Sequence, residues 1–211
     1  MYKLVVFDFD GTIADTMPVL EQNALELIPK YYNLSITEAR TAYRSTTGLP
    51  FVQQIEILFP KQPCNEEVVT LFEEAKIKSI FKQPLFPDVK EILRYLKEKN
   101  YLVSISSSTI QPIIVEYFKR VNILDMIDTI LGFRPGFEKG KHHFHYLMKK
   151  YKIQSKQLVF IGDSLKDKER AYMSDVPFIA RIGPMFSESD FREVGHQGEI
   201  ISALLDLKKI I

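Results

Sequence analysis

The sequence predicts an α/β fold in which helices cover both faces of a parallel sheet. Five short runs of apolar and β-branched residues have the composition of strands buried on both sides. These runs are Lys3–Phe9, Tyr101–Ser107, Thr129–Phe133, Leu158–Gly162 and Phe178–Ile182. Helical patterns lie between most of them, and such alternation is typical of a parallel sheet between two helical layers.

Two of the intervening stretches have the apolar spacing of an amphipathic helix, i, i+3, i+4, i+7. The apolar positions are Val89, Ile92, Leu93 and Leu96 in the first stretch and Phe144, Leu147, Met148 and Tyr151 in the second. We expect each of these helices to pack its apolar face on the sheet.

The connection between the first two strands is too long for a single crossover helix. Residues 17–84 of this connection contain several helical patterns, including the stripe Val68, Leu71, Phe72 and Ala75, and no convincing strand. Breaks at residues 33–35, 47–50 and 59–63 separate the expected helices. We therefore predict a main domain of residues 1–16 and 85–211 and an inserted helical domain of residues 17–84. An insert at this point lies over the carboxyl ends of the strands, where open α/β sheets bind ligands, and acts as a lid.

Composition excludes several classes of function. The 211 residues carry a formal net charge of +1, which provides no overall field to attract nucleic acid or an anionic membrane. No apolar run is long enough to cross a bilayer, and the first residues lead directly into a strand, without the pattern of a signal peptide. The one cysteine, Cys64, cannot form an intrachain disulfide, which fits a reducing, cytoplasmic setting.

Aspartates follow two of the predicted strands. Asp8 and Asp10 close the first strand, and side chains two positions apart on a strand point the same way. Asp163 closes the fourth strand, and Asp167 falls on the same face of the helix that begins there. Two unit charges about 4 Å apart repel by about 4 kcal/mol at an effective dielectric constant near 20. A hard cation such as Mg²⁺ relieves this repulsion, so the four aspartates predict a magnesium site.

These aspartate motifs resemble those of the haloacid dehalogenase-like superfamily. The run Asp8-Phe9-Asp10-Gly11-Thr12 is similar to its first motif, D-x-D-G-T, and Gly162-Asp163-Ser164 with Asp167 is similar to its fourth, G-D-S-x-x-D. The insert lies where the C1-type cap of the phosphoglycolate phosphatase-like branch lies. The resemblance spans the chain and implies a Rossmann-like core domain, a helical cap and a Mg²⁺-dependent phosphatase acting on a small phosphorylated metabolite.

The resemblance also implies a role for each aspartate. Asp8 is the expected nucleophile that becomes an aspartyl-phosphate, and Asp10 is the general acid that then serves as general base. The carboxylates of Asp8 and Asp163 and the backbone carbonyl of Asp10 are the expected ligands of Mg²⁺. Asp167 supports the metal through water or orients the lysine.

Two phosphate-binding groups of the superfamily have more than one candidate here. The second motif is a serine or threonine at the end of the second strand, and among Ser106, Ser107 and Ser108 the count from the strand start favours Ser107. The third motif is a lysine before the fourth strand. Spacing back from the fourth motif favours Lys139 over Lys141, although the usual K-P pair is absent.

The loop between two cap helices is expected to contact the leaving group. Arg44 and Thr47, with Ser108 from the core, are the predicted substrate-binding residues, and an ordinary helix-breaking turn is the alternative for the loop.

Two other functions remain open at this point. A phosphosugar mutase shares D-x-D-G but typically has E-D in its fourth motif, so Gly162 favours hydrolysis. A catalytically silent binding protein of the same fold would be expected to lose the aspartates. A small phosphorylated metabolite is the expected partner, with no nucleic acid or membrane, and the chain is expected to be a monomer or a homodimer.

Overall fold

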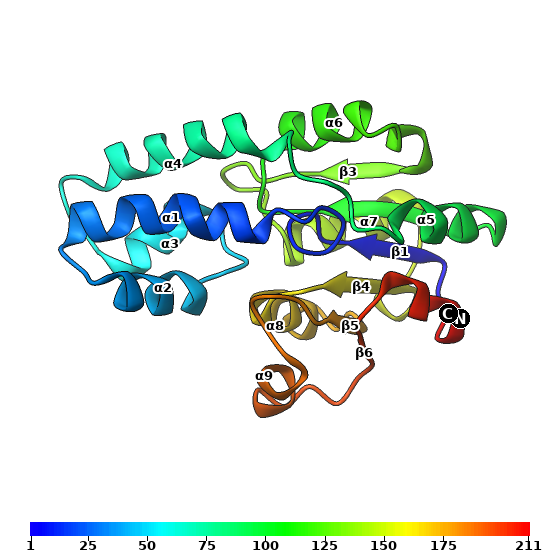
Figure 1. Cartoon of the computed structure of the whole chain (residues 1–211). Coiled ribbons are helices and arrows are strands. Elements are labelled where there is room, and N and C mark those ends of the chain that lie inside the picture. Colours follow the sequence, from blue (N-terminus) through cyan, green and yellow to red (C-terminus); the bar gives the residue numbers. More distant parts are fainter.

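A computed structural model describes all residues 1–211 and contains one parallel sheet of six strands. The strands are β1 (Leu4–Phe7), β2 (Leu102–Ser106), β3 (Thr129–Leu131), β4 (Leu158–Gly162), β5 (Phe178–Arg181) and β6 (Ile200–Ile201). Their order is β3-β2-β1-β4-β5-β6 (Figure 1). The predicted α/β class is confirmed. The sequence did not reveal β6, because a strand of two residues has no periodicity to detect.

The chain also forms nine α-helices and three short 3₁₀ helices, all but the last of which lie between strands. The helices are α1 (Met17–Tyr32), α2 (Ile36–Ser45), α3 (Phe51–Leu58), α4 (Asn65–Ile80), α5 (Val89–Glu98), α6 (Gln111–Arg120), α7 (Lys141–Tyr151), α8 (Leu165–Met173) and α9 (Glu188–Glu193). The 3₁₀ helices are η1 (Leu124–Met126), η2 (Ser155–Gln157) and η3 (Leu204–Lys209). None of these helices is both long and apolar enough to span a membrane.

Alternate side chains of β1 enter two separate apolar layers. Val5 and Phe7 pack in the layer formed by α5, α6 and η3, whereas Leu4 and Val6 pack in the layer of α7, α8 and α9. Every side chain of β1 is therefore buried, as expected for a central parallel strand. The predicted stripes of α5 and α7 face these layers.

The inserted helices α1–α4 have an apolar core of their own. Its buried members include Leu20, Ile28, Phe51, Ile55 and Phe72. The bundle lies beyond the carboxyl end of β1, at the opposite end of the molecule from the two termini (Figure 1). The chain leaves and re-enters the main domain side by side, since the Asp15 amide donates to the Pro84 carbonyl at 3.0 Å. These features support the proposed division at residues 16–17 and 84–85.

The buried face of α4 differs from the predicted stripe. Val68 and Phe72 are buried as expected, but Leu71 and Ala75 are only half-buried. The face continues instead through Lys76 and Ile80. These four buried residues are spaced i, i+4, so Lys76 lies within an otherwise apolar row. Its ammonium group lies 3.8 Å from the Asp10 carboxylate.

The strand order reverses between β1 and β4, which are neighbours in the sheet although the chain visits β2 and β3 between them. In open α/β sheets, ligands bind at the carboxyl ends of strands at such a reversal. The aspartates that follow β1 and β4 therefore converge at this position.

Candidate active site

Asp8 occupies the first position after β1 and is 4% exposed. Its amide donates to the Ile161 carbonyl of β4 at 2.8 Å, so the ladder of the sheet holds its backbone in place. One carboxylate oxygen, Oδ2, lies 3.0 Å from Nζ of Lys139. The other, Oδ1, is buried and has no hydrogen-bond partner, which leaves it available to a ligand.

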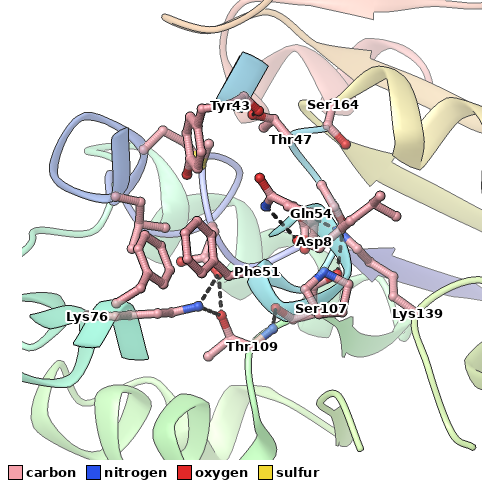
Figure 2. Close-up of a pocket in the computed structure, with 18 of the residues that line it drawn as sticks. Asp8, Tyr43, Thr47, Phe51, Gln54, Lys76, Ser107, Thr109, Lys139 and Ser164 are labelled. Atoms are coloured by element: carbon pink, nitrogen blue, oxygen red, sulfur yellow. Dashed lines mark hydrogen bonds and ion pairs between the residues drawn. The ribbon is translucent and has the colours of Figure 1, made fainter. Parts of the chain in front are cut away.

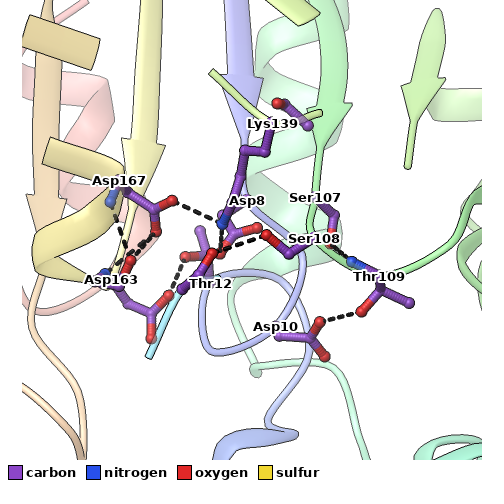
Figure 3. A network of polar contacts seen from close by, with 12 residues as sticks. Asp8, Asp10, Thr12, Ser107, Ser108, Thr109, Lys139, Asp163 and Asp167 are labelled. Carbon is purple, nitrogen blue, oxygen red and sulfur yellow. Dashed lines mark hydrogen bonds and ion pairs between the residues drawn. The ribbon is translucent and has the colours of Figure 1, made fainter. Parts of the chain in front are cut away.

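Lys139 lies between two carboxylates (Figure 3). Its Nζ is 2.7 Å from Oδ1 of Asp167 as well as 3.0 Å from Asp8. Burial alone would lower the pKa of Lys139, but the two carboxylates raise it above its usual value, so the side chain stays charged. Lys141 is exposed on the first turn of α7. The structure therefore brings Lys139, and not Lys141, next to Asp8.

Asp163 and Asp167 complete an acidic cluster with Asp8. One carboxylate oxygen from each of the three lies within 4.8 Å of the others. Asp163 accepts a hydrogen bond from the Thr12 hydroxyl at 3.1 Å, and Asp167 accepts one from Ser164, the N-cap of α8, at 2.7 Å. Burial raises the pKa of Asp8 well above its usual range, against the opposing effect of Lys139. Burial and the neighbouring Asp167 raise the pKa of Asp163 to about 7.

This donor set fits Mg²⁺. The cluster supplies only carboxylate oxygens, which are the ligands that hard cations prefer. One lysine cannot neutralise three buried acids, and the raised pKa values of Asp8 and Asp163 show the cost of ionising them without a cation. We infer that Asp8 and Asp163 would bind the ion, with Asp167 beside them.

Asp10 points away from the acidic cluster, toward the cap. Its carboxylate accepts a hydrogen bond from Thr109 (Figure 3). It also accepts one from Thr16 at 2.7 Å and lies 3.8 Å from Nζ of Lys76 on α4. The side chain is therefore held on the cap side of the site, separate from the three clustered acids. The expectation that the Asp10 backbone carbonyl binds the metal stays a prediction.

Gly11 lets the chain turn tightly between these two groups of acids. Its φ is +78°, a conformation that side chains disfavour, and a Cβ here would overlap the Asp163 carboxylate. The Gly11 carbonyl accepts a hydrogen bond from Nη1 of Arg181 at 2.6 Å. The Arg181 guanidinium also stacks 3.6 Å from the centre of the Phe86 ring, so a buried arginine of β5 supports the turn.

The three candidate serines after β2 have different environments. Ser106 faces away from the site and bonds to Nδ1 of His143 at 2.9 Å. Ser107 lines the cavity between the main domain and the inserted helices, and its hydroxyl oxygen accepts a hydrogen bond from the Thr109 amide at 3.0 Å. Ser108 also lines the cavity, but its hydroxyl donates to the Gly48 carbonyl of the cap at 2.8 Å. Of the two serines that line the cavity, Ser107 is the one whose hydroxyl proton is not given to another protein group.

The cavity lies between the main domain and the inserted helices (Figure 2). Asp8, Asp10, Ser107, Lys139 and Asp163 line it from the main-domain side. From the cap, its walls are the aromatic rings of Tyr43, Phe51 and Phe72 and the charged side chains of Glu73 and Lys76. The cap therefore contributes both apolar and charged surface next to the carboxylates.

The predicted position of Arg44 is corrected by the structure. Its guanidinium pairs with Glu21 of α1, with Nε 2.6 Å from Oε1, and it does not line the cavity. Thr47 does line the cavity, although its hydroxyl donates to the Tyr43 carbonyl at 3.2 Å. Lys76 is the cap cation that faces the carboxylates, and it donates to Thr109 at 2.6 Å.

Sequence reasoning missed Lys76, Thr109 and Arg181 as members of the site. The buried row on α4 carried a detectable signal for Lys76, because a lysine at i+4 from Phe72 interrupts apolar residues. Nothing in the local sequence distinguishes Thr109 or Arg181, which reach the site through contacts with distant segments.

Replacing Asp163 with asparagine should stabilise the metal-free protein at high pH. The pKa of Asp163 is about 7 in the folded chain and 3.8 ordinarily, so the folded state binds the proton more tightly. The free energy of unfolding then falls as pH rises between these values, and a neutral amide avoids this loss. We expect Asp163→Asn to raise Tm in EDTA more at pH 8 than at pH 5.

The matched control is Asp125→Asn, which removes an exposed carboxylate and should leave Tm nearly unchanged at both pH values. Excess Mg²⁺ should stabilise the natural sequence more than the Asp163 variant, because an ion that binds only the folded state raises its stability. A lower Tm for Asp163→Asn in EDTA at pH 8 would contradict this account.

Comparison with known proteins shows relatives in both sequence and fold. The chain is 24% identical over 182 residues to phosphoglycolate phosphatase of Haemophilus influenzae, covering 79% of each protein. A haloacid dehalogenase-like family hydrolase from Streptococcus pneumoniae superposes with a TM-score of 0.81 at 21% identity, covering 100% of this chain and 99% of that one. CbbY from Rhodobacter sphaeroides, solved with phosphate, gives a TM-score of 0.77 at 15% identity, covering 98% and 96%.

The family is established by the extent of the sequence match. The model of the haloacid dehalogenase-like hydrolases matches residues 5–181, a span that contains both aspartate motifs, Lys139 and the whole insert. The chain therefore belongs to the haloacid dehalogenase-like hydrolase family.

Proposed function

We propose that this hydrolase is a Mg²⁺-dependent phosphatase that cleaves a small phosphomonoester through an aspartyl-phosphate on Asp8. One observation carries the proposal: a buried carboxylate with one oxygen paired to Lys139 keeps its other oxygen free, next to two further carboxylates. A candidate nucleophile, a cation for the phosphate and a site for a metal ion are thereby combined at the carboxyl ends of β1 and β4.

In the first step, the free Oδ1 of Asp8 forms a bond to phosphorus as the bond between phosphorus and the ester oxygen breaks. Lys139 and the Ser107 hydroxyl are placed to offset and hold the charge of the phosphoryl oxygens. Bound Mg²⁺ would neutralise charge on the phosphate and so allow two anions to approach each other.

Asp10 is proposed to give its proton to the departing oxygen. Its hydrogen bonds to Thr16 and Thr109 hold the carboxylate on the cap side of the cavity, where the leaving group would lie. In the second step, Asp10 takes a proton from water as the water oxygen bonds to phosphorus. The bond from phosphorus to Asp8 then breaks, which releases phosphate and restores both carboxyl groups.

Close packing at Gly162 favours hydrolysis over the mutase alternative. A Cβ at this position would lie 2.7 Å from Oδ2 of Asp167 and 2.8 Å from its Cβ. The chain thus has little room for a side chain at position 162, where mutases typically have glutamate.

The cap supports a small substrate that carries a charged leaving group. The loop residues Leu49 and Pro50 close over the cavity, and the aromatic rings of α2, α3 and α4 restrict its size. Lys76 places one ammonium group near Asp10, beside the expected position of the leaving oxygen. Because the Haemophilus influenzae relative is a phosphoglycolate phosphatase, 2-phosphoglycolate is the first substrate to test.

The proposed chemistry predicts that phosphatase activity requires both Mg²⁺ and Asp8. Purified protein should hydrolyse p-nitrophenyl phosphate with Mg²⁺ and lose this activity in excess EDTA. Asp8→Asn keeps the size of the side chain but removes the attacking charge, so turnover should fall by several powers of ten while the circular dichroism spectrum is retained. Full activity in EDTA, or in the asparagine variant, would overturn the mechanism.

The two lysines near the start of α7 should differ sharply. Lys139→Met removes the cation that pairs with Asp8 and Asp167 and should abolish most activity, whereas Lys141→Met alters only an exposed side chain. Breaking a buried ion pair typically costs about 3–5 kcal/mol of stability, so folding of the first variant is checked by thermal unfolding with Mg²⁺ present. Equal activity of the two variants would contradict the assignment of Lys139.

Lys76 and Arg44 provide a matched pair for the leaving group. A charged hydrogen bond contributes about 1.5–3 kcal/mol, or roughly ten- to a hundredfold in kcat/KM. Lys76→Met should lower kcat/KM by about this factor for 2-phosphoglycolate and less for p-nitrophenyl phosphate, which has no carboxylate. Arg44→Met should affect neither ester strongly. Equal losses on both esters for Lys76→Met would assign this lysine to holding Asp10 instead.

A further inference from the structure

One backbone carbonyl of the cap accepts two hydrogen bonds from the main domain. Gly48 lies in the loop between α2 and α3, and its carbonyl oxygen is 2.8 Å from Oγ of Ser108 and 2.7 Å from Nη1 of Arg170. Arg170 is on α8, 122 residues away in sequence. Gly48 and the flanking residues Thr47 and Leu49 line the cavity, so these two hydrogen bonds join the main domain to the cap wall of the cavity.

The side chain of Arg170 packs against Gly140 on its way to the cap. A Cβ on Gly140 would lie 3.1 Å from both Cβ and Cγ of Arg170, which is tighter than ordinary contact. Gly140 follows Lys139, at the position where the sequence lacks the usual proline, and its φ is +99°. The absence of a side chain here leaves room for the stem of Arg170. Both hydrogen bonds of its guanidinium go to Gly48 and Ser108.

The cap loop approaches the main domain closely at Gly48. Its φ is +99°, and a Cβ here would overlap Oγ of Ser164 and lie 3.0 Å from Cβ of Lys166. Only glycine combines this backbone conformation with such close contact to the start of α8. The geometry of the loop therefore depends on the contact with α8 and with the segment after β2.

We propose that Arg170 is a positioning residue that, together with Ser108, clamps the Gly48 carbonyl and holds the cap closed over Asp8. The clamp ties the cap to two segments of the site, because Ser108 follows Ser107 and α8 carries Asp167. A closed cap excludes water from phosphoryl transfer and completes the site. The kinetic consequence rests on the proposed phosphatase function, whereas the clamp itself can be measured without turnover.

Hydrogen exchange of the cap loop tests the clamp directly. The protein is incubated with Mg²⁺ and beryllium fluoride, a mimic of a phosphoryl group, and exchange is followed in a peptide covering residues 46–50. Arg170→Met keeps the stem that packs on Gly140 but removes the guanidinium. Loss of a charged hydrogen bond should accelerate exchange in this loop roughly ten- to a hundredfold. Unchanged exchange in the loop would overturn the proposal.

Arg94→Met is the matched control, since Arg94 is an exposed arginine of α5, away from the cap loop. With this substitution, the exchange rate of residues 46–50 and the phosphatase activity should equal those of the unsubstituted protein. If the natural protein proves inactive as a phosphatase, the proposed function fails, but the exchange experiment still decides whether the clamp exists.

Alanine substitutions at Gly48 and Gly136 distinguish the effect of close contact from the effect of backbone strain. Gly136 has a φ of +75° but open space around its Cβ position, whereas Gly48 adds the overlap with Ser164. Gly48→Ala should therefore accelerate loop exchange and lower kcat/KM at least tenfold, and Gly136→Ala should do neither. Equal effects of the two substitutions would refute close contact as the cause. This pair keeps the proposal testable if Arg170→Met does not fold.

A double variant tests whether Arg170 and Ser108 act as one unit. Each single variant, Arg170→Met and Ser108→Ala, should lower kcat/KM on both p-nitrophenyl phosphate and 2-phosphoglycolate, because cap closure serves either ester. The double variant should lose less than the product of the two single losses, since both residues hold the same carbonyl. Fully multiplicative losses would show independent roles and contradict the clamp.

Discussion

The rest of the site depends on the buried ion pairs of Lys139 with Asp8 and Asp167. Parallel strands β1 and β4 end side by side, and their ends bring Asp8, Asp163 and Asp167 together in a region closed to solvent. Such a cluster is costly unless cations compensate it. Lys139 neutralises part of the charge from a loop before α7, through contacts of 3.0 and 2.7 Å, and a hard metal ion is suited to neutralise the rest.

The position of Lys139 also gives Asp8 and Asp10 different surroundings. Because Lys139 pairs with only one oxygen of Asp8, the other oxygen has no hydrogen-bond partner, while Asp167 holds the ammonium group in place. Asp10 stands outside this ionic cluster and is held by hydroxyl groups of Thr16 and Thr109. Asp8 and Asp10, the proposed nucleophile and proton donor, thus have different surroundings although they are two residues apart, which would allow one short motif to support two roles.

The inserted helices contact this centre at two points. Lys76 extends from α4 to Asp10, and the Gly48 loop rests on the start of α8. Both contacts join the cap to residues beside the carboxylates, so the position of the cap and the completeness of the site are linked. The bundle has its own apolar core, and we expect it to move as a unit about the paired crossings near Asp15 and Pro84.

The sequence alone was sufficient to predict the parallel sheet, the helical insert and the aspartates at the strand ends. Each of these features is local: a strand is a continuous apolar run, and Asp8 and Asp163 directly follow such runs. Spacing along the chain already favoured Lys139 and Ser107, and the structure places both at the cavity. The buried row on α4 also held a local signal for Lys76. Only the tertiary structure showed that Arg44 pairs with Glu21 outside the cavity. It alone also brought Arg170 and Arg181 to the site. Long, flexible side chains can reach many partners. Which partner they meet depends on how segments far apart in the chain pack together, and no local pattern records that packing.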